Sequence, residues 1–268
     1  MRGNIHMNKY CKYIELGFSD GLYYRTSNIM TFLSSFFVDY VKVAVWYAAV
    51  AFSAKRINSN LINDTLLYMI LAAAISSIYR TQPSVSLSEA YVNGSLIHRR
   101  VYPISITISN FCDMLGRSLS RFIINVFPSL IILGWDFRPS WCILPQRIPM
   151  VCINIVLGLY LNYILFAVLD VLCFWLRDTS TLQKMKDIIF KFFSGSLFPL
   201  WFLSATLSQI SNYLPFSKQL YSPVSYLMGT TISKVYFRDM KILLIYSVFG
   251  TVVVYLLWRK GIKRVESF

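Results

Sequence analysis

Residues 82–100 read QPSVSLSEAYVNGSLIHRR, a polar segment between two long apolar runs. From Ser84 onward apolar residues recur on one side, which predicts a short helix, and the Asn93-Gly94 pair is typical of a helix end. Glu89 and several serines make the other side polar. On the surface of an otherwise apolar protein, such an element is typical of a contact with a soluble partner.

The rest of the chain has the composition of a membrane protein. Of its 268 residues, 56% are hydrophobic and only 14% are charged, which lies outside the range of soluble globular domains. Several runs approach the roughly 20 apolar residues that cross about 30 Å of hydrocarbon. These runs are continuous and do not alternate with a period of two, so a transmembrane barrel is disfavoured. The predicted fold class is an all-α polytopic membrane protein.

The apolar runs predict six transmembrane helices within a domain formed by residues 28–268. They lie at about 28–53, 61–78, 111–134, 148–176, 188–203 and 242–258. The stretch 200–229 is interrupted by prolines and polar residues, and it predicts short re-entrant helices in the outer leaflet. Apolar residues at every fourth position between Tyr10 and Leu22 predict an amphipathic interfacial helix within residues 1–27.

The basic residues indicate the orientation. The chain has 26 Lys and Arg residues against 12 Asp and Glu, and the basic ones lie in short loops between apolar runs. With six spans, the side that holds both termini carries roughly twice as many basic residues as the other side, which predicts cytoplasmic termini. The same arrangement disfavours nucleic acid as a partner, because no basic recognition motif is present.

The residues that would support catalysis or metal binding are missing from the sequence. His6 and His98 have no metal-ligand spacing, and none of the five cysteines forms a C-x-x-C pair, so no metal site is expected. No phosphate-binding loop and no hydrolase or metalloprotease motif occurs. The chain is therefore not expected to be an enzyme, and no catalytic residue is assigned.

Two charges lie inside the first predicted span. Asp39 and Lys42 are three residues apart, on one helix face. Each alone would cost about 2.5–3.5 kcal/mol at the centre of a bilayer, so the two are expected to pair. The pair fits either a polar patch on a translocation path or a neutralised pair buried against another helix.

Three further charges enter the third predicted span with helical spacing. Asp113, Arg117 and Arg121 form a stripe at positions i, i+4 and i+8. This stripe fits either a contact with anionic headgroups or substrate, or a salt-bridge ladder between helices. Asp170, near the end of the fourth span, is a single acid that needs a partner, and Arg121 or Arg117 is the expected one.

Three stretches resemble a known family, the type-2 ABC transporter permeases, and in particular their short six-span bacterial exporter members. The first is the loop SEAYVNGSLIHRRVYPIS (88–105), with an acid, a glycine turn and a basic end before Pro103. The second is FFSGSLFPLWFL (192–203), where small residues precede Pro199. The third is LPFSKQLYSPVSYLMG (214–229). Their order along the chain agrees with the six predicted spans.

The resemblance implies a permease that pairs with a second permease subunit, as a homodimer or heterodimer, in the bacterial plasma membrane. It also implies separate ABC ATPase subunits that bind ATP and Mg²⁺ and act on a cytoplasmic coupling helix, here Ser84–Asn93. The residues implied in coupling are Ser84, Leu87, Glu89, Tyr91, Asn93 and Gly94. Those implied to line or brace the path are Asp39, Lys42, Asp113, Arg117, Arg121 and Asp170.

Two other functional classes remain compatible with the residues alone. One is a transporter driven by an ion gradient. The other is a membrane-embedded immunity or scaffold subunit that binds a partner. An ATPase that associates with the chain separates the exporter from both alternatives.

Overall fold

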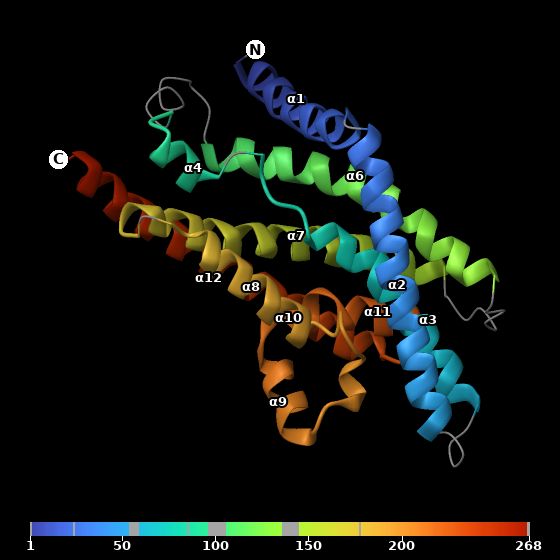
Figure 1. Ribbon diagram of the computed structural model, residues 1–268. Coiled ribbons are helices and arrows are strands. Elements are labelled where there is room, and N and C mark those ends of the chain that lie inside the picture. The colour runs from blue at the N-terminus through green and yellow to red at the C-terminus, as the bar shows by residue number, and fades with distance from the viewer. Residues whose placement is uncertain are drawn as a thin grey trace.

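The computed structural model describes residues 2–23, 25–53, 59–84, 86–95, 106–135, 145–176 and 178–266, and these contain helices and no strands. The loop that ends the first resemblance, from Leu96 to Ser105, lies outside the described residues. Figure 1 shows long helices packed side by side, with the short helices α9, α10 and α11 gathered in the lower part of the view. The all-α class predicted from hydropathy is confirmed.

The first half of the chain forms α1 (Arg2–Tyr23), α2 (Arg25–Ser53), α3 (Ser59–Tyr79), α4 (Leu87–Val92) and α6 (Ile106–Trp135). The second half forms η2 (Pro145–Arg147), α7 (Ile148–Val171), η3 (Leu172–Phe174), α8 (Ser180–Phe193), η4 (Leu200–Phe202), α9 (Ala205–Tyr213), α10 (Pro215–Gln219), α11 (Tyr221–Leu227) and α12 (Ser233–Glu266).

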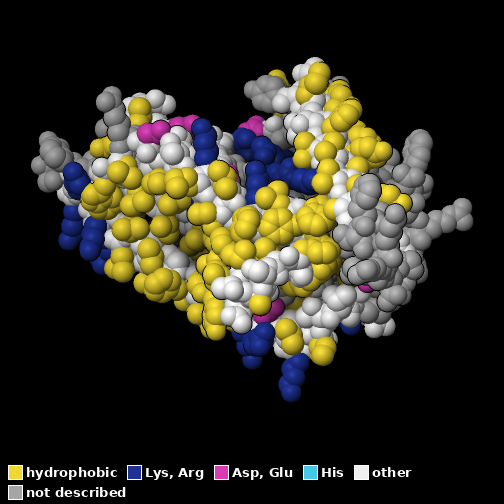
Figure 2. Space-filling model, turned by 60° about the horizontal axis from the view of Figure 1, so that its bottom comes forward, with side chains coloured by type: hydrophobic (Ala, Val, Ile, Leu, Met, Phe, Trp, Pro, Cys, Tyr) yellow, Lys and Arg dark blue, Asp and Glu magenta, His cyan; other side chains and the backbone are white. Residues whose placement is uncertain are grey.

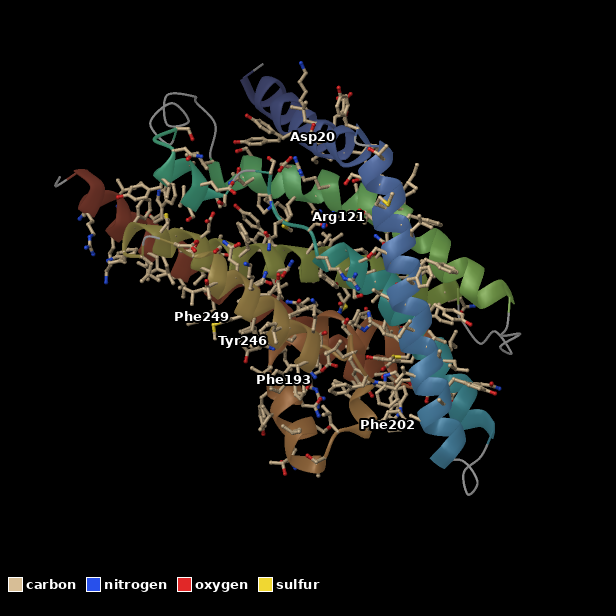
Figure 3. The ribbon with its side chains drawn as sticks, viewed as in Figure 1. Asp20, Arg121, Phe193, Phe202, Tyr246 and Phe249 are labelled. Carbon is tan, nitrogen blue, oxygen red and sulfur yellow. The ribbon has the colours of Figure 1, made fainter. Side chains whose placement is uncertain are left out.

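Three helices in the described part of the chain are long and apolar enough to cross a membrane: Thr26–Ala49, Ile148–Phe174 and Ser233–Arg264. They correspond to the first, fourth and sixth predicted spans. The last helix is longer than the predicted 242–258, because it begins before the apolar run and continues into the basic residues that follow. Many of its apolar side chains are exposed, including Phe249 at 68%, which is labelled in Figure 3.

The prediction of one continuous span at 188–203 is wrong. Helix α8 begins at Ser180, before the predicted span, and ends at Phe193 after 14 residues. It ends there because Gly195 has a positive φ of 84°, a conformation that favours glycine. The hydroxyl of Tyr68 donates to the Gly195 carbonyl at 2.9 Å, and Pro199 follows.

The stretch after α8 consists of short helices, as predicted, and protein covers much of their backbone. Gln219, Leu220 and Val224 are completely buried. The hydroxyl of Tyr79, at the end of α3, donates to the Gln219 carbonyl at 2.9 Å. Such contacts provide the burial that irregular backbone requires within a membrane protein.

Helix α1 forms within the predicted N-terminal region and lies along α6 (Figure 1). Ile14 and Phe18 of the predicted apolar stripe lie against Gly116 of α6, and Gly17 beside them is buried, whereas Leu22 at the end of the stripe is 40% exposed. A Cβ at Gly17 would collide with the backbone of Asp113, and one at Gly116 would collide with the backbone of Ile14. The close approach of the two backbones thus depends on glycine in both helices.

Candidate functional site

The predicted coupling helix is present but shorter than Ser84–Asn93. Helix α4 begins after Ser86, whose hydroxyl accepts from the Glu89 N–H at 3.0 Å, an N-cap contact. Pro83 disfavours helical backbone in the residue before it, and residues 81–84 are not helical. The predicted end is confirmed, since Asn93 is the C-cap and Gly94 has a φ of 69°.

Asp170, on α7, holds the start of α4. Its carboxylate accepts from the backbone N–H of Leu87 at 2.6 Å and of Ser88 at 3.0 Å, and it is 3% exposed. The prediction of Arg121 or Arg117 as its partner is therefore wrong. The first N–H groups of a helix lack intrahelical acceptors, and a buried carboxylate satisfies two of them with charge-assisted hydrogen bonds.

One side of α4 is packed against the protein. Leu87 and Ala90 are buried together with Val171, Cys173 and Phe174, and Leu257 and Trp258 of α12 complete this cluster. The ring of Tyr91 lies edge-on to that of Phe174, with centroids 5.6 Å apart. The contacts join α4 to both α7 and α12.

The opposite side of α4 faces outward. Glu89, Asn93 and Gly94 are exposed, and Val92 is exposed at 65% against 40% for Tyr91. Of the predicted docking residues, Glu89 is thus accessible to a partner, whereas the ring of Tyr91 is partly covered by Phe174 and partly exposed. Val92 was not among the predicted residues. Its position three residues after Glu89, on the same helix face, is the sequence signal that could have identified it.

The segment before α4 is joined to α6. The Ser84 N–H donates to Asp113 at 2.7 Å. The predicted pairing of Asp113 with Arg117 is present, with the carboxylate 3.3 Å from Nε, and Arg117 also reaches Asp20 of α1 at 2.9 Å (Figure 3). Asp113 and Arg117 of the stripe therefore form a salt-bridge ladder between α6 and α1 in the described part of the chain, whereas Arg121 takes no part in it.

The other predicted path residues lie near the end of α3. The Asp39–Lys42 pair forms on α2 at 3.3 Å. The guanidinium of Arg121 extends from α6 (Figure 3) and donates to the Arg80 carbonyl at 3.2 Å. The structure brings Lys42 and Arg121 toward Arg80, but it does not bring them to Asp170.

Two polar clusters were missed by sequence reasoning. Lys218 and Asp239 form a buried ion pair at 3.2 Å, and the Ser222 hydroxyl donates to the same carboxylate at 2.9 Å. Lys186, also buried, lies 3.2 Å from Asp187 and donates to Asn162 at 3.4 Å. Lys218 and Asp239 come from different helices, as do Lys186 and Asn162, so no spacing rule relates the two members of either pair.

At the start of α8, the Ser180 N–H and hydroxyl each donate to the carboxylate of Asp178 at 2.8 Å. These hydrogen bonds stabilise the charged form and lower the pKa of the carboxyl below its ordinary value. Within the described residues, no group of His, Cys, Asp and Glu could hold a metal ion.

Residues 113–268 match the model of the family described as ABC-2 family transporter protein. The chain belongs to the ABC-2 transporter family. A comparison with curated proteins gave no match. The resemblance inferred from the three quoted stretches is confirmed at the level of the family.

Membership of the ABC-2 family makes the chain a membrane permease of that type, and such permeases work with ABC ATPase components. The matched part begins at Asp113 and includes α7, α8 and α12. Asp113 and Asp170, whose carboxylates hold α4 and the segment before it, lie within the matched part. Helix α4 itself precedes the matched part. A role for α4 must therefore be inferred from its contacts and not from the family match.

Proposed function

We propose that this ABC-2 permease is the transmembrane subunit of an ATP-driven exporter, and that α4 is the element on which a separate ATPase subunit acts. The observation that carries the proposal is the double attachment of α4. Asp170 of α7 accepts from the first turn of the helix, and Asp113 of α6 accepts from Ser84 just before it. A displacement of α4 is thereby transmitted to two long helices at once.

The exposed surface of α4 suits a protein partner. Glu89 and Val92 place a charge and an apolar group side by side on a helix whose other side is buried against Val171 and Phe174. A contact that combines an apolar centre with a polar rim is common at protein interfaces. Because the buried side is anchored, a partner that pushes on the exposed side moves the helix without peeling it away.

The remaining parts of the proposal follow from the same function. Five of the six crossings are α2, α3, α6, α7 and α12. The remaining crossing combines α8 with the short helices that follow it. The chain lies in the bacterial plasma membrane with both termini in the cytoplasm. A second permease subunit completes the translocation path. The ATPase subunits bind ATP and Mg²⁺, so this chain has no catalytic residue of its own.

The experiment is capture of the ATPase by the tagged permease. An ABC ATPase co-expressed with the chain is expected to co-purify with wild type and to be largely lost from the double variant E89K/V92D. The charge-reversal control D64K changes an exposed acid on α3 and is expected to retain the ATPase. Equal capture by E89K/V92D and wild type would contradict the role of α4.

A transport measurement separates the exporter from an ion-gradient transporter. In inside-out vesicles that contain the complex, uptake of a transported dye is expected to require ATP and to be inhibited by vanadate. Uptake that follows a proton gradient and is indifferent to ATP would overturn the proposal.

A further inference from the structure

A small pocket of about 190 Å³ lies between the end of α3 and the middle of α8. Tyr79 and Arg80 line it from α3, and Asp187, Phe190 and Lys191 line it from α8. Figure 2 shows a hollow in the protein surface with Lys and Arg side chains inside it and hydrophobic side chains on both sides. Arg80 and Lys191 are both exposed, so their charges are accessible to a molecule that enters the pocket.

Two further helices bring cations to the same place. Lys42 of α2 is close enough to Arg80 and Lys191 for both to repel its charge. Arg121 of α6 donates to the Arg80 carbonyl at 3.2 Å and is repelled by the Arg80 guanidinium. Arg80 and Lys191 line the pocket, and Lys42 and Arg121 add positive charge near Arg80 from two further helices.

Carboxylates near the pocket do not balance these charges. Asp39 lies 3.3 Å from Lys42, and Asp187 lies 3.2 Å from Lys186, which adds a fifth cation. Among the side chains that the structure describes, neither Arg80 nor Lys191 has an ion-pair partner within 4 Å. These like charges repel one another, so an anion that enters the pocket lowers the energy of the whole group.

We propose that this pocket binds the phosphate group of an anionic amphiphile, and that a phosphate-bearing amphiphile is the substrate class of the permease. Several cations near one space suit an anionic phosphate group, and arginine recognises phosphate through paired donors. Tyr79 and Phe190 supply apolar walls. Ile188 and Ile189, next to them on α8, are 64% and 42% exposed, which gives the apolar part of the ligand a surface to follow. The assignment of the bound molecule as cargo rests on the proposed function.

The test is ligand binding by the full chain in detergent, followed by native mass spectrometry. Phosphatidylglycerol is titrated against phosphatidylcholine with the same acyl chains, and inorganic phosphate is added as a competitor. Wild type is expected to bind phosphatidylglycerol at least tenfold more tightly. Competition by inorganic phosphate assigns the site to the phosphate group from either source, whereas binding without competition assigns it to the lipid form, and both results support the proposal.

Variants then locate the site. R80Q/K191Q is expected to lose the preference for phosphatidylglycerol, while R80K/K191R, which keeps both charges, retains most of it. The control K234Q/K241Q removes two exposed charges near the start of α12, a helix that does not line the pocket. This control is expected to behave as wild type. Size-exclusion profiles and Tm values confirm that each variant is folded. Equal affinity for the two lipids, or an unchanged preference in R80Q/K191Q, would overturn the proposal.

ATPase capture by the same variants separates this inference from the proposed function. R80Q/K191Q is expected to co-purify with the ATPase as wild type does, because neither residue lies on α4. Loss of lipid preference with retained ATPase supports both statements. Absence of any lipid preference in wild type, with normal ATPase capture, overturns only the anion site.

Discussion

Asp170 joins two segments that lie more than eighty residues apart in the sequence. Its carboxylate is buried, and both of its described hydrogen bonds come from the first turn of α4. Hydrogen bonds to charged groups contribute roughly 1.5–3 kcal/mol each. The position and rigidity of α4 therefore depend strongly on this one side chain.

Substitution of Asp170 by Asn is expected to loosen α4. The amide has one accepting oxygen and no charge, so at least one of the N–H groups of Leu87 and Ser88 loses its partner. Hydrogen–deuterium exchange in the peptide 86–95 is expected to accelerate by about tenfold or more, which corresponds to a loss of about 1.4 kcal/mol. D64N, at an exposed acid of α3, serves as the control. Identical exchange in D170N and wild type would contradict this role.

The residue-scale predictions from sequence succeeded where the partners share a helix. Asp39 with Lys42, and Asp113 with Arg117, are three and four residues apart, and helix geometry alone places them together. The partner of Asp170 could not be predicted in this way, because it is backbone from a distant segment. The same reason explains why the pairing of Lys218 with Asp239 was missed.

At the scale of elements, the contact between α1 and α6 depends on small residues. Gly17 and Gly21 of α1 and Gly116 of α6 allow the two backbones to approach closely. Asp20 and Arg117 add an ion pair of 2.9 Å across the same contact. Close packing of this kind excludes even one additional methyl group without a shift of the helices.

The double variant G17A/G116A is expected to separate α1 from α6. Cys11 of α1 and Cys112 of α6 are free thiols on two helices that pack together, so a short thiol-reactive cross-linker is expected to join them. The yield of this cross-link is expected to fall several-fold in G17A/G116A. G250A, in α12, is the matched control because its added methyl group would meet one side chain, that of Ile164, and no backbone of a neighbouring helix. An undiminished yield in G17A/G116A would show that the glycines do not set this contact.

The elements that sequence reasoning placed wrongly were those ended by local breakers. The fifth apolar run contains Gly195 and Pro199, and α8 ends just before them. Its start at Ser180 lies before the predicted 188–203, because the charged residues of its first turns do not belong to the apolar run. Helix α4 was predicted three residues too early, because Ser86 is its N-cap and the Ser84 N–H donates to Asp113 instead of joining the helix.

At the scale of the whole molecule, hydropathy and charge were sufficient to predict the class of protein. Long apolar runs require helices within a bilayer, and membership of the ABC-2 family agrees with this. The gathering of Lys42, Arg80, Arg121 and Lys191 could not be predicted, because it depends on how four helices pack. The packing also fixes which side of α4 stays exposed.

The double attachment of α4 has a consequence for the whole permease. Helix α7 carries Asp170, packs against α12 and contributes to the core that contains Tyr68 and Val224. A force applied to α4 therefore reaches the centre of the molecule through rigid helices. This transmission is the central claim, and it requires that α4 be accessible from the cytoplasm and covered by the ATPase.

Labelling of a cysteine at position 92 tests this claim most directly. The variant V92C is made in a chain whose native cysteines are replaced by serine, and a membrane-impermeant maleimide is applied to vesicles of both orientations. We predict rapid labelling in inside-out vesicles stripped of ATPase, strong protection when the ATPase is bound, and none in right-side-out vesicles. Labelling in right-side-out vesicles, or no protection by the bound ATPase, would contradict the account.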